Sequence, residues 1–125
     1  MAVDALSAYD PTNVFARILR REIPCRKVYD DAHVLAFHDI NPLAPVHVLV
    51  IPKGEYVSMA DFLDRAGDAK ITGFWRGVAR VIAALNLAPG GFRMLSNAGR
   101  DAGQEVPHMH LHIFAGRELG PMLGR

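Results

Sequence analysis

Two stretches of the chain show the three- and four-residue spacing of apolar side chains that is typical of an amphipathic helix. The first begins after Pro11, where Thr12 or Asn13 can cap a helix, and it ends before Pro24. The second is longer, covers about residues 68–87, and stops at the Pro-Gly-Gly sequence that follows. In the simplest interpretation both apolar faces belong to the core. They consist of Val14, Phe15, Ile18 and Leu19 in the first helix and of Ile71, Phe74, Trp75, Val78, Ile82 and Leu85 in the second.

Five shorter segments have the composition and the flanking turn residues of β-strands. One of them is an apolar run between Pro45 and Pro52 that only His47 interrupts, which is typical of a strand well inside a sheet. Short connections join neighbouring strands, and this favours antiparallel pairing. The sequence therefore predicts an α+β fold with a five-stranded, mostly antiparallel sheet, one short helix and one long helix. The predicted strands are residues 27–30, 34–39, 46–51, 92–96 and 109–115.

Length and composition indicate one globular domain. The chain has 125 residues, of which 50% are hydrophobic and 22% are charged, so it can bury a core and is unlike a disordered chain. We expect residues 1–12 to form a flexible leader and residues 13–125 to form the domain.

The net charge and the cysteine content limit the classes of partner and the cellular compartment that we expect. The formal net charge is +1, which gives no strong attraction to nucleic acid or to a membrane surface, and we expect neither as a partner. Cys25 is the one cysteine, so no internal disulfide is possible, as suits a reducing compartment. The N-terminus lacks the pattern of a secretory signal, and no apolar run approaches the ~20 residues of a membrane span. We therefore expect a cytoplasmic protein.

Three of the six histidines fall within five residues, at positions 108, 110 and 112. In a strand, alternate side chains point to the same face. His108, His110 and His112 would then lie on one face, each about 6.5–7 Å from the next by the strand rise. Met109 and its neighbours at alternate positions would face the core.

Such a row of imidazole rings suits chemistry at phosphorus. Histidine transfers protons near neutral pH, because its free pKa is about 6.5, and its ring nitrogen is a competent nucleophile. The loop at residues 99–104 contains Gly99 and Gly103 and can offer backbone N–H groups to an anion such as phosphate. The pattern thus favours phosphoryl or nucleotidyl transfer. Two alternatives stay open: a zinc site, since His-x-His on a strand can chelate, and purely structural histidines.

Residues 108–114, HMHLHIF, resemble the signature of the histidine triad family. Further segments resemble the bacterial-type, nucleotide-binding branch of that family, whose members are nucleoside phosphoramidate hydrolases. The similarity extends from about residue 13 to residue 122. It rests on RREIP at residues 20–24, AFHDI at 36–40, APVHVLVIPK at 44–53, NAG at 97–99 and GQ at 103–104.

The resemblance implies four catalytic histidines. His110 matches the nucleophile that attacks the α-phosphorus and carries the nucleotidyl group. His112 matches a histidine that contacts the phosphate and assists the leaving group. His108 matches the residue that orients its neighbours, and His47 matches a fourth histidine that hydrogen-bonds within the site. His33 and His38 match no role in the triad and are interpreted as structural.

The resemblance also implies a nucleotide site that needs no metal and no cofactor. Asp39 matches the carboxylate that binds the ribose hydroxyls. The Glu105 side chain is expected to turn away from the phosphate while its backbone N–H donates to it. The tail at residues 118–125 is expected to shape the leaving-group side. The implied phosphate contacts are Asn97, Gly103, Gln104, Glu105 and Val106, and the implied walls of the purine pocket are Val14, Phe15, Ile18, Phe37, Ile40 and Leu49.

The function implied by the resemblance is the hydrolysis of purine nucleoside phosphoramidates, or of related aminoacyl adenylates. The reaction would proceed through a nucleotidyl-histidine and release a nucleoside monophosphate. The resemblance further implies a homodimer in which the sheets of two copies join through the long helix and the fourth strand. The alternatives are a dinucleoside polyphosphate hydrolase or nucleotidyl transferase of the same superfamily, and a nucleotide-binding regulatory protein.

Overall fold

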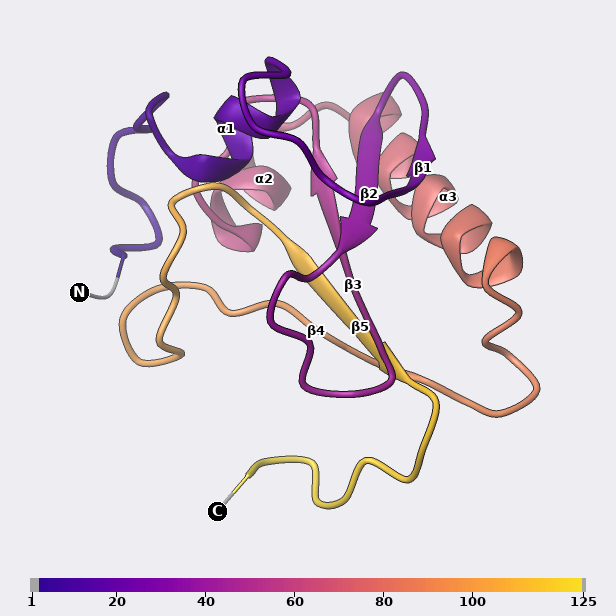
Figure 1. The fold of residues 1–125 in the computed structure, drawn as a ribbon. Helices are drawn as coiled ribbons and strands as arrows, with labels where there is room; N and C mark the ends of the chain where they lie inside the picture. The colour runs from indigo at the N-terminus through magenta and orange to yellow at the C-terminus, as the bar shows by residue number, and fades with distance from the viewer. Residues whose placement is uncertain (1–2, 125) are drawn as a thin grey trace.

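The computed structural model describes residues 3–124 and confirms the predicted fold class. Within these residues five strands form one open sheet in the order β1-β2-β3-β5-β4, and all four neighbouring pairs are antiparallel (Figure 1). The first two residues of the expected leader and Arg125 lie outside the described residues. The strands are β1 (Lys27–Asp30), β2 (Val34–His38), β3 (Val46–Pro52), β4 (Arg93–Leu95) and β5 (Leu111–Ala115).

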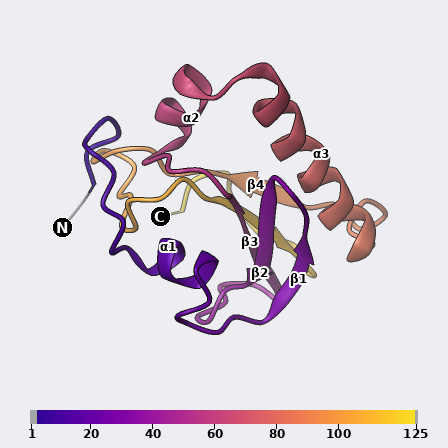
Figure 2. The ribbon, with the colours of Figure 1, turned by 90° about the horizontal axis from the view of Figure 1, so that it is seen from above.

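In the described part of the chain three helices accompany the sheet: α1 (Val14–Leu19), α2 (Met59–Arg65) and α3 (Asp68–Ala84). Helices α2 and α3 cover one face of the sheet, and α1 lies on the other (Figure 2). Helix α2 was not predicted, because its seven residues are too few to show a periodic pattern. Ser58 caps it, since the Ser58 hydroxyl oxygen accepts a hydrogen bond from the backbone N–H of Asp61.

The core under α3 corrects one detail of the predicted apolar face. Phe74, Val78 and Val81 are buried on α3, whereas Trp75 remains 38% exposed. The helix approaches the sheet closely at Gly77, where an added Cβ would lie 2.5 Å from a methyl carbon of Val34 on β2. The buried side of α3 is therefore centred on Phe74, Gly77, Val78 and Val81, and Trp75 lies at its edge.

A second, smaller apolar cluster lies on the face that carries α1. Phe15 of α1 packs there with Leu35, Phe37, Leu49 and Ile51 of β2 and β3. Directly opposed residues of antiparallel strands place their side chains on the same face. Phe37 opposes Leu49, and Leu49 opposes His112 on β5, so the last triad histidine belongs to this face of the sheet.

Residues 3–12, the described part of the expected leader, are attached to the domain. The Val3 N–H donates to the carbonyl oxygen of Gln104 at 2.8 Å, and the Ser58 hydroxyl donates to the carbonyl oxygen of Ala5 at 2.7 Å. The Tyr9 hydroxyl lies 2.7 Å from Nδ1 of His108. The segment thus lies against the domain next to the triad instead of standing apart from it.

Candidate active site

The three triad rings lie next to one another, although only part of the predicted strand is regular. Strand β5 begins at Leu111, so His108 and His110 precede it and only His112 is in the strand. The ring centroids of His110 and His112 are 5.1 Å apart, and Phe15 lies 4.9 Å from His110 and 6.3 Å from His108. The alternation predicted from the sequence thus continues past the end of the strand and gathers the rings beneath α1.

The hydrogen bonds of His110 fix its proton and free one nitrogen. Its Nδ1 lies 2.7 Å from the carbonyl oxygen of His108, and a carbonyl only accepts, so Nδ1 carries the hydrogen. Burial lowers the pKa of His110, which keeps the ring neutral at pH 7. The Ser96 hydroxyl donates to the His110 carbonyl oxygen at 2.7 Å and fixes the backbone. Nε2 of His110 therefore keeps a free lone pair.

His108 is the most deeply buried of the rings, with 0% of its surface exposed. Its Nε2 lies 2.9 Å from the carbonyl oxygen of Pro52, so Nε2 carries the hydrogen and Nδ1 accepts from the Tyr9 hydroxyl. Burial, with a smaller contribution from the neighbouring His110, lowers the pKa of His108 to about 4. The ring is neutral, and hydrogen bonds hold both of its nitrogens.

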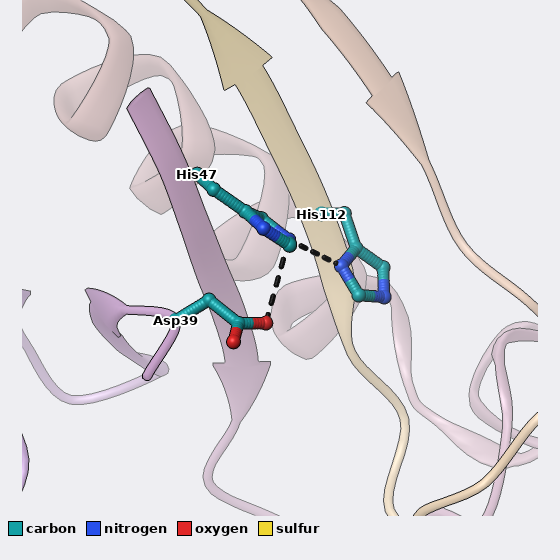
Figure 3. Close-up of side chains that lie close together, drawn as sticks. All are labelled: Asp39, His47 and His112. Atoms are coloured by element: carbon teal, nitrogen blue, oxygen red, sulfur yellow. Dashed lines mark hydrogen bonds and ion pairs between the residues drawn. The ribbon is translucent and has the colours of Figure 1, made fainter. Parts of the chain in front are cut away.

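His47 links His112 to Asp39 (Figure 3). The Leu43 N–H donates to Nδ1 of His47 at 3.1 Å, so the hydrogen of the neutral His47 ring is on Nε2. That Nε2 lies 2.9 Å from Nδ1 of His112 and 3.4 Å from Oδ2 of Asp39. His112 Nδ1 is thus an acceptor, and the neutral His112 ring carries its own hydrogen on Nε2.

The pKa of His112 is also lowered to about 4. Burial is the largest cause, and the nearby His110 and His47 rings act in the same direction. Burial lowers the pKa of His47 as well. All four rings of the site are therefore neutral near pH 7, with a lone pair on Nε2 of His110 and a hydrogen on Nε2 of His112.

Asp39, His47 and His112 also have the composition of a metal site. Each offers one potential ligand atom, and these atoms lie within 4.8 Å of one another. A histidine nitrogen binds a metal through its lone pair. The Leu43 N–H, however, occupies the lone pair on Nδ1 of His47, which leaves Nε2 protonated. The arrangement fits a hydrogen-bonded network better than a metal centre.

The predicted purine pocket is assembled in part. Phe15, Phe37 and Leu49 share the smaller apolar cluster, and Ile18 and Val106 pack against it. Two predicted members lie outside this wall. Ile40 is 91% exposed in the turn after β2, and Val14 is 39% exposed on α1. Helical spacing could not distinguish exposed Val14 from buried Phe15, because the burial of each depends on how the short helix is rotated relative to the sheet.

The glycine loop is held by its own hydrogen bonds. Gly99, which has φ of +84°, donates its N–H to the side-chain oxygen of Gln104, and the Gln104 N–H donates to the Gly99 carbonyl oxygen. The Gly103 N–H donates to the carbonyl oxygen of Arg100. These N–H groups are occupied, contrary to the expectation that they would offer themselves to an anion. Within residues 3–124, the N–H groups of Glu105 and Val106 donate to no backbone acceptor.

Gln104 has a different place from the one predicted. It is 1% exposed, and its amide nitrogen donates to the carbonyl oxygens of Val57 and Val106 while its oxygen accepts from Gly99. Its side chain braces the loop through these three hydrogen bonds. Among the other predicted phosphate contacts, Asn97 is half-buried after β4, Gly103 is exposed, and the side chain of Glu105 is exposed.

The sequence did not predict the contacts of two residues, Tyr9 at His108 and Asn13 at the start of α1. Tyr9 was counted in the leader, and no pattern connects it with a histidine 99 positions away. Asn13 was recognised only as a possible helix cap. It does cap α1, accepting from the Ala16 N–H at 2.9 Å, and its amide also donates to the carbonyl oxygen of Asp10 at 2.7 Å.

A hollow lies beyond Phe114, whose ring stacks on that of His112 with 5.7 Å between centroids. Its volume is about 240 Å³, and residues of the C-terminal tail line one side of it. Arg93 donates to the carbonyl oxygens of Gly120 and Pro121, and Arg117 donates to that of Leu43. The tail is thus fixed beside the His112 end of the row of rings.

Known proteins resemble the chain over most of its length. The sequence profile of the HIT domain family matches residues 20–119. A 13.2 kDa HIT-like protein of Azospirillum brasilense is 63% identical over 115 residues, 92% of this chain and 94% of that protein. A purine nucleoside phosphoramidase of Escherichia coli K12 is 43% identical over 111 residues, 88% of this chain and 92% of the enzyme.

Solved structures show the same fold. A histidine triad protein from Clostridium difficile superposes with a TM-score of 0.77 at 39% identity, covering 88% of this chain and 95% of that one. A HIT family hydrolase from Clostridium thermocellum superposes with a TM-score of 0.77 at 35% identity, covering 90% of this chain and 96% of that one. None of the described helices is long and apolar enough to cross a membrane.

Proposed function

The chain belongs to the HIT domain family, and on this premise we propose that it is a hydrolase of purine nucleoside phosphoramidates that works through a nucleotidyl-histidine. Its relatives support a hydrolase in general, and the purine nucleoside phosphoramidase of Escherichia coli is the relative that suggests this substrate class. We place its activity in the cytoplasm, in keeping with its single cysteine.

One observation carries the proposal: a neutral His110 with a free lone pair on Nε2 lies beside a neutral His112 with a hydrogen on Nε2. Backbone and ring hydrogen bonds fix both proton positions. The ring centroids are 5.1 Å apart, so one phosphoramidate group can meet a nucleophile and a proton donor together.

In the first step, Nε2 of His110 bonds to the α-phosphorus and the P–N bond breaks. The leaving nitrogen takes the electron pair of that bond and the Nε2 hydrogen of His112, which a proton from solvent replaces, and it departs as an amine. His110 becomes cationic as it bonds to phosphorus, and His112 ends the step neutral. The hydrogen bond from His47 to Nδ1 of His112 keeps the hydrogen of His112 on Nε2, on the side of the leaving nitrogen.

In the second step, water attacks the phosphorus of the nucleotidyl-histidine. The N–P bond breaks, the electron pair returns to Nε2 of His110, and one proton of the water passes to solvent, which balances the proton taken up in the first step. The product is a nucleoside monophosphate, and both rings regain the proton positions of the free protein. Two steps at one nucleophile replace one difficult displacement.

The same site offers contacts for the nucleotide. In the proposal, the purine packs on the apolar wall formed by Phe15, Phe37 and Leu49. The Asp39 carboxylate, which also accepts from the Asn41 N–H, binds the ribose hydroxyls. Asn97 and the backbone N–H groups of Glu105 and Val106 bind the phosphate. The leaving amine faces the hollow beside Phe114.

A substrate assay with wild type and His110→Ala tests the proposal. We expect the variant to bind AMP with nearly unchanged affinity and to lose turnover of an adenosine phosphoramidate, because it keeps the pocket and lacks the nucleophile. His38→Ala is the matched control. His38 opposes Val48, whose side chain is in the core under α3, so its ring lies on the far face of the sheet from the triad.

Near wild-type turnover in His110→Ala would refute the proposed mechanism. Faster turnover of a diadenosine polyphosphate than of the phosphoramidate by the wild-type protein would favour the polyphosphate hydrolase instead. AMP binding with no turnover of either substrate would favour a nucleotide-binding regulatory protein. A guanosine phosphoramidate assayed alongside defines the purine preference.

We also propose that two copies pair through α3 and the edge strand β4. Trp75 on α3 and Met94 on β4 are each 38% exposed, and Met94 opposes Ile113, which places it on the α3 face of the sheet. Pairing there would cover both side chains and the open edge of the sheet. Light scattering that gives the mass of a single chain at micromolar concentration would contradict this pairing.

A further inference from the structure

The segment at residues 3–9, here called the N-terminal strap, lies across the glycine loop and reaches the triad. Val3 bonds to the backbone of Gln104, and Ala5 accepts from the Ser58 hydroxyl. The Ala5 side chain lies against Gly99, where an added Cβ would be 3.3 Å from the Ala5 Cβ. The strap therefore contacts the loop at two points before it ends at Tyr9.

Tyr9 completes the hydrogen bonding of a fully buried ring. Nε2 of His108 donates to the Pro52 carbonyl oxygen, so Nδ1 is left as an acceptor that needs a donor. The Tyr9 hydroxyl supplies it at 2.7 Å, and the Tyr9 and His108 rings meet edge to face with centroids 5.6 Å apart. Burial raises the pKa of Tyr9, so its phenol stays protonated and able to donate at neutral pH.

The ring that Tyr9 holds belongs to the residue that orients the nucleophile. The carbonyl oxygen of His108 accepts the Nδ1–H of His110 at 2.7 Å, and this bond directs Nε2 of His110 toward the site. A movement of His108 would therefore move the acceptor that fixes the nucleophile. The Tyr9 hydroxyl is thus connected to the His110 ring by two hydrogen bonds, one to Nδ1 of His108 and one from Nδ1 of His110 to the His108 carbonyl oxygen.

We propose that Tyr9 is a positioning residue, which fixes His108 through its hydroxyl and thereby the orientation of the nucleophile His110. The N-terminal strap is then a working part of the active site. This inference rests on the proposed function for its kinetic consequence, whereas the Tyr9–His108 link is testable without any substrate.

Removal of one hydroxyl provides the test. Tyr9→Phe is compared with Tyr29→Phe, which deletes a hydroxyl that donates to Asp31 at 2.8 Å near the edge strand β1. We expect kcat for an adenosine phosphoramidate to fall about tenfold in Tyr9→Phe, because small misplacements of a reacting group are costly. We expect KM and the AMP dissociation constant to change by less than about twofold, since the nucleotide contacts remain. Tyr29→Phe should leave all three constants unchanged.

A kcat for Tyr9→Phe within about twofold of wild type overturns the proposal, and so does a loss of AMP affinity as large as the loss of kcat. The latter result would mean that the variant distorts the whole site and that Tyr9 has no selective effect on the nucleophile.

Nitrogen-15 NMR of the imidazole rings adds a measurement on the wild-type protein, which needs no variant to fold. In the wild-type protein we expect the His108 hydrogen on Nε2 and the shift of an accepting nitrogen on Nδ1. Tyr9→Phe should move the Nδ1 resonance, and Tyr29→Phe should not. A wild-type spectrum with the His108 hydrogen on Nδ1 overturns the inference. Wild-type protein that shows the expected tautomer but hydrolyses no phosphoramidate would refute the proposed function alone and leave the Tyr9–His108 link standing.

Discussion

Acidification from pH 7 to pH 5 should destabilise this protein well before its carboxylates titrate. Burial of His108 and His112 lowers their pKa values to about 4, whereas an unfolded chain exposes rings with a pKa of about 6.5. Below pH 6.5 the unfolded chain binds protons that the folded protein does not accept. The free energy of unfolding therefore falls as the pH drops through the window between 6.5 and 4.

The magnitude follows from the two pKa values. A ring with a pKa of about 4 when folded and about 6.5 when unfolded costs about 2 kcal/mol of stability between pH 7 and pH 5. His108 and His112 together therefore remove about 3–4 kcal/mol. His110 and His47, whose pKa values are also lowered by burial, act in the same direction. Against a typical total stability of about 5–15 kcal/mol this is a large loss.

Urea unfolding at fixed protein concentration, followed by tryptophan fluorescence at half-unit steps from pH 7 to pH 5, measures the effect. His108→Gln removes one titrating ring and should reduce the loss by about 2 kcal/mol, even though the variant starts from a lower stability at pH 7. His112→Gln should reduce it by a similar amount.

Asp31 and Asp61 do not contribute to the loss of stability between pH 7 and pH 5. The pKa values of Asp31 and Asp61 are lowered in the folded protein, so the stability that these groups contribute is present above about pH 4 and is lost only below it. Equal stability at pH 7 and pH 5, or an unchanged pH dependence in His108→Gln, would refute the reasoning that the buried rings are held neutral.

Two stability predictions concern the packing that positions the site. Asn13→Ala should lower the free energy of unfolding by about 1 kcal/mol in urea titrations, because it removes the cap of α1, and Asn13→Asp should recover most of it. A loss no larger in Asn13→Ala than in Asn13→Asp would contradict the capping role. Gly77→Val should cost about 1–3 kcal/mol, because its Cβ would lie 2.5 Å from a methyl carbon of Val34. Gly90→Val is the control, since nothing lies within 4 Å of its Cβ position, and equal losses in both would argue against the close approach of α3.

The sequence predicts the fold well where a pattern has room to repeat. An apolar run and its bounding prolines locate β3 to within one residue, and helical spacing finds α3 from its first residue. Helix α2 has seven residues and no repeat to detect, so its stability comes from the Ser58 cap and from packing. The exposure of Trp75 depends on the angle at which α3 crosses the sheet, which spacing alone does not fix.

For the candidate site, too, the sequence predicts some residues and leaves others unplaced. The spacing of His108, His110 and His112 is enough to predict that their rings lie together. The family resemblance adds His47 and Asp39, which come from other elements and meet His112 only through strand register. Gln104 could not be placed, because its burial depends on two partners in its own loop and on Val57, which lies 47 residues away in the sequence. Tyr9 could not be placed either, since a polar residue in an irregular segment has no periodicity that reveals its partner.

The proton positions in this site are set mainly by the backbone at the two ends of β3. The Leu43 N–H, in the turn that leads into the strand, makes Nδ1 of His47 an acceptor. The carbonyl oxygen of Pro52, the last residue of the strand, makes Nε2 of His108 a donor. The third determinant, the His108 carbonyl oxygen, is itself placed by the segment that runs into β5, the antiparallel partner of β3.

Backbone groups do not titrate in this pH range, so they fix one tautomer of the neutral His47, His108 and His110 rings, and His47 in turn fixes that of His112. The register of β3 against β5 brings His47 to Phe114 and Leu49 to His112, and a slip of one residue would turn His47 to the opposite face of the sheet. The free lone pair on Nε2 of His110 is consequently a property of strand register and burial. The fold is expected to lose stability in acid because it keeps these rings neutral, and a neutral His110 is the form that the proposed mechanism requires.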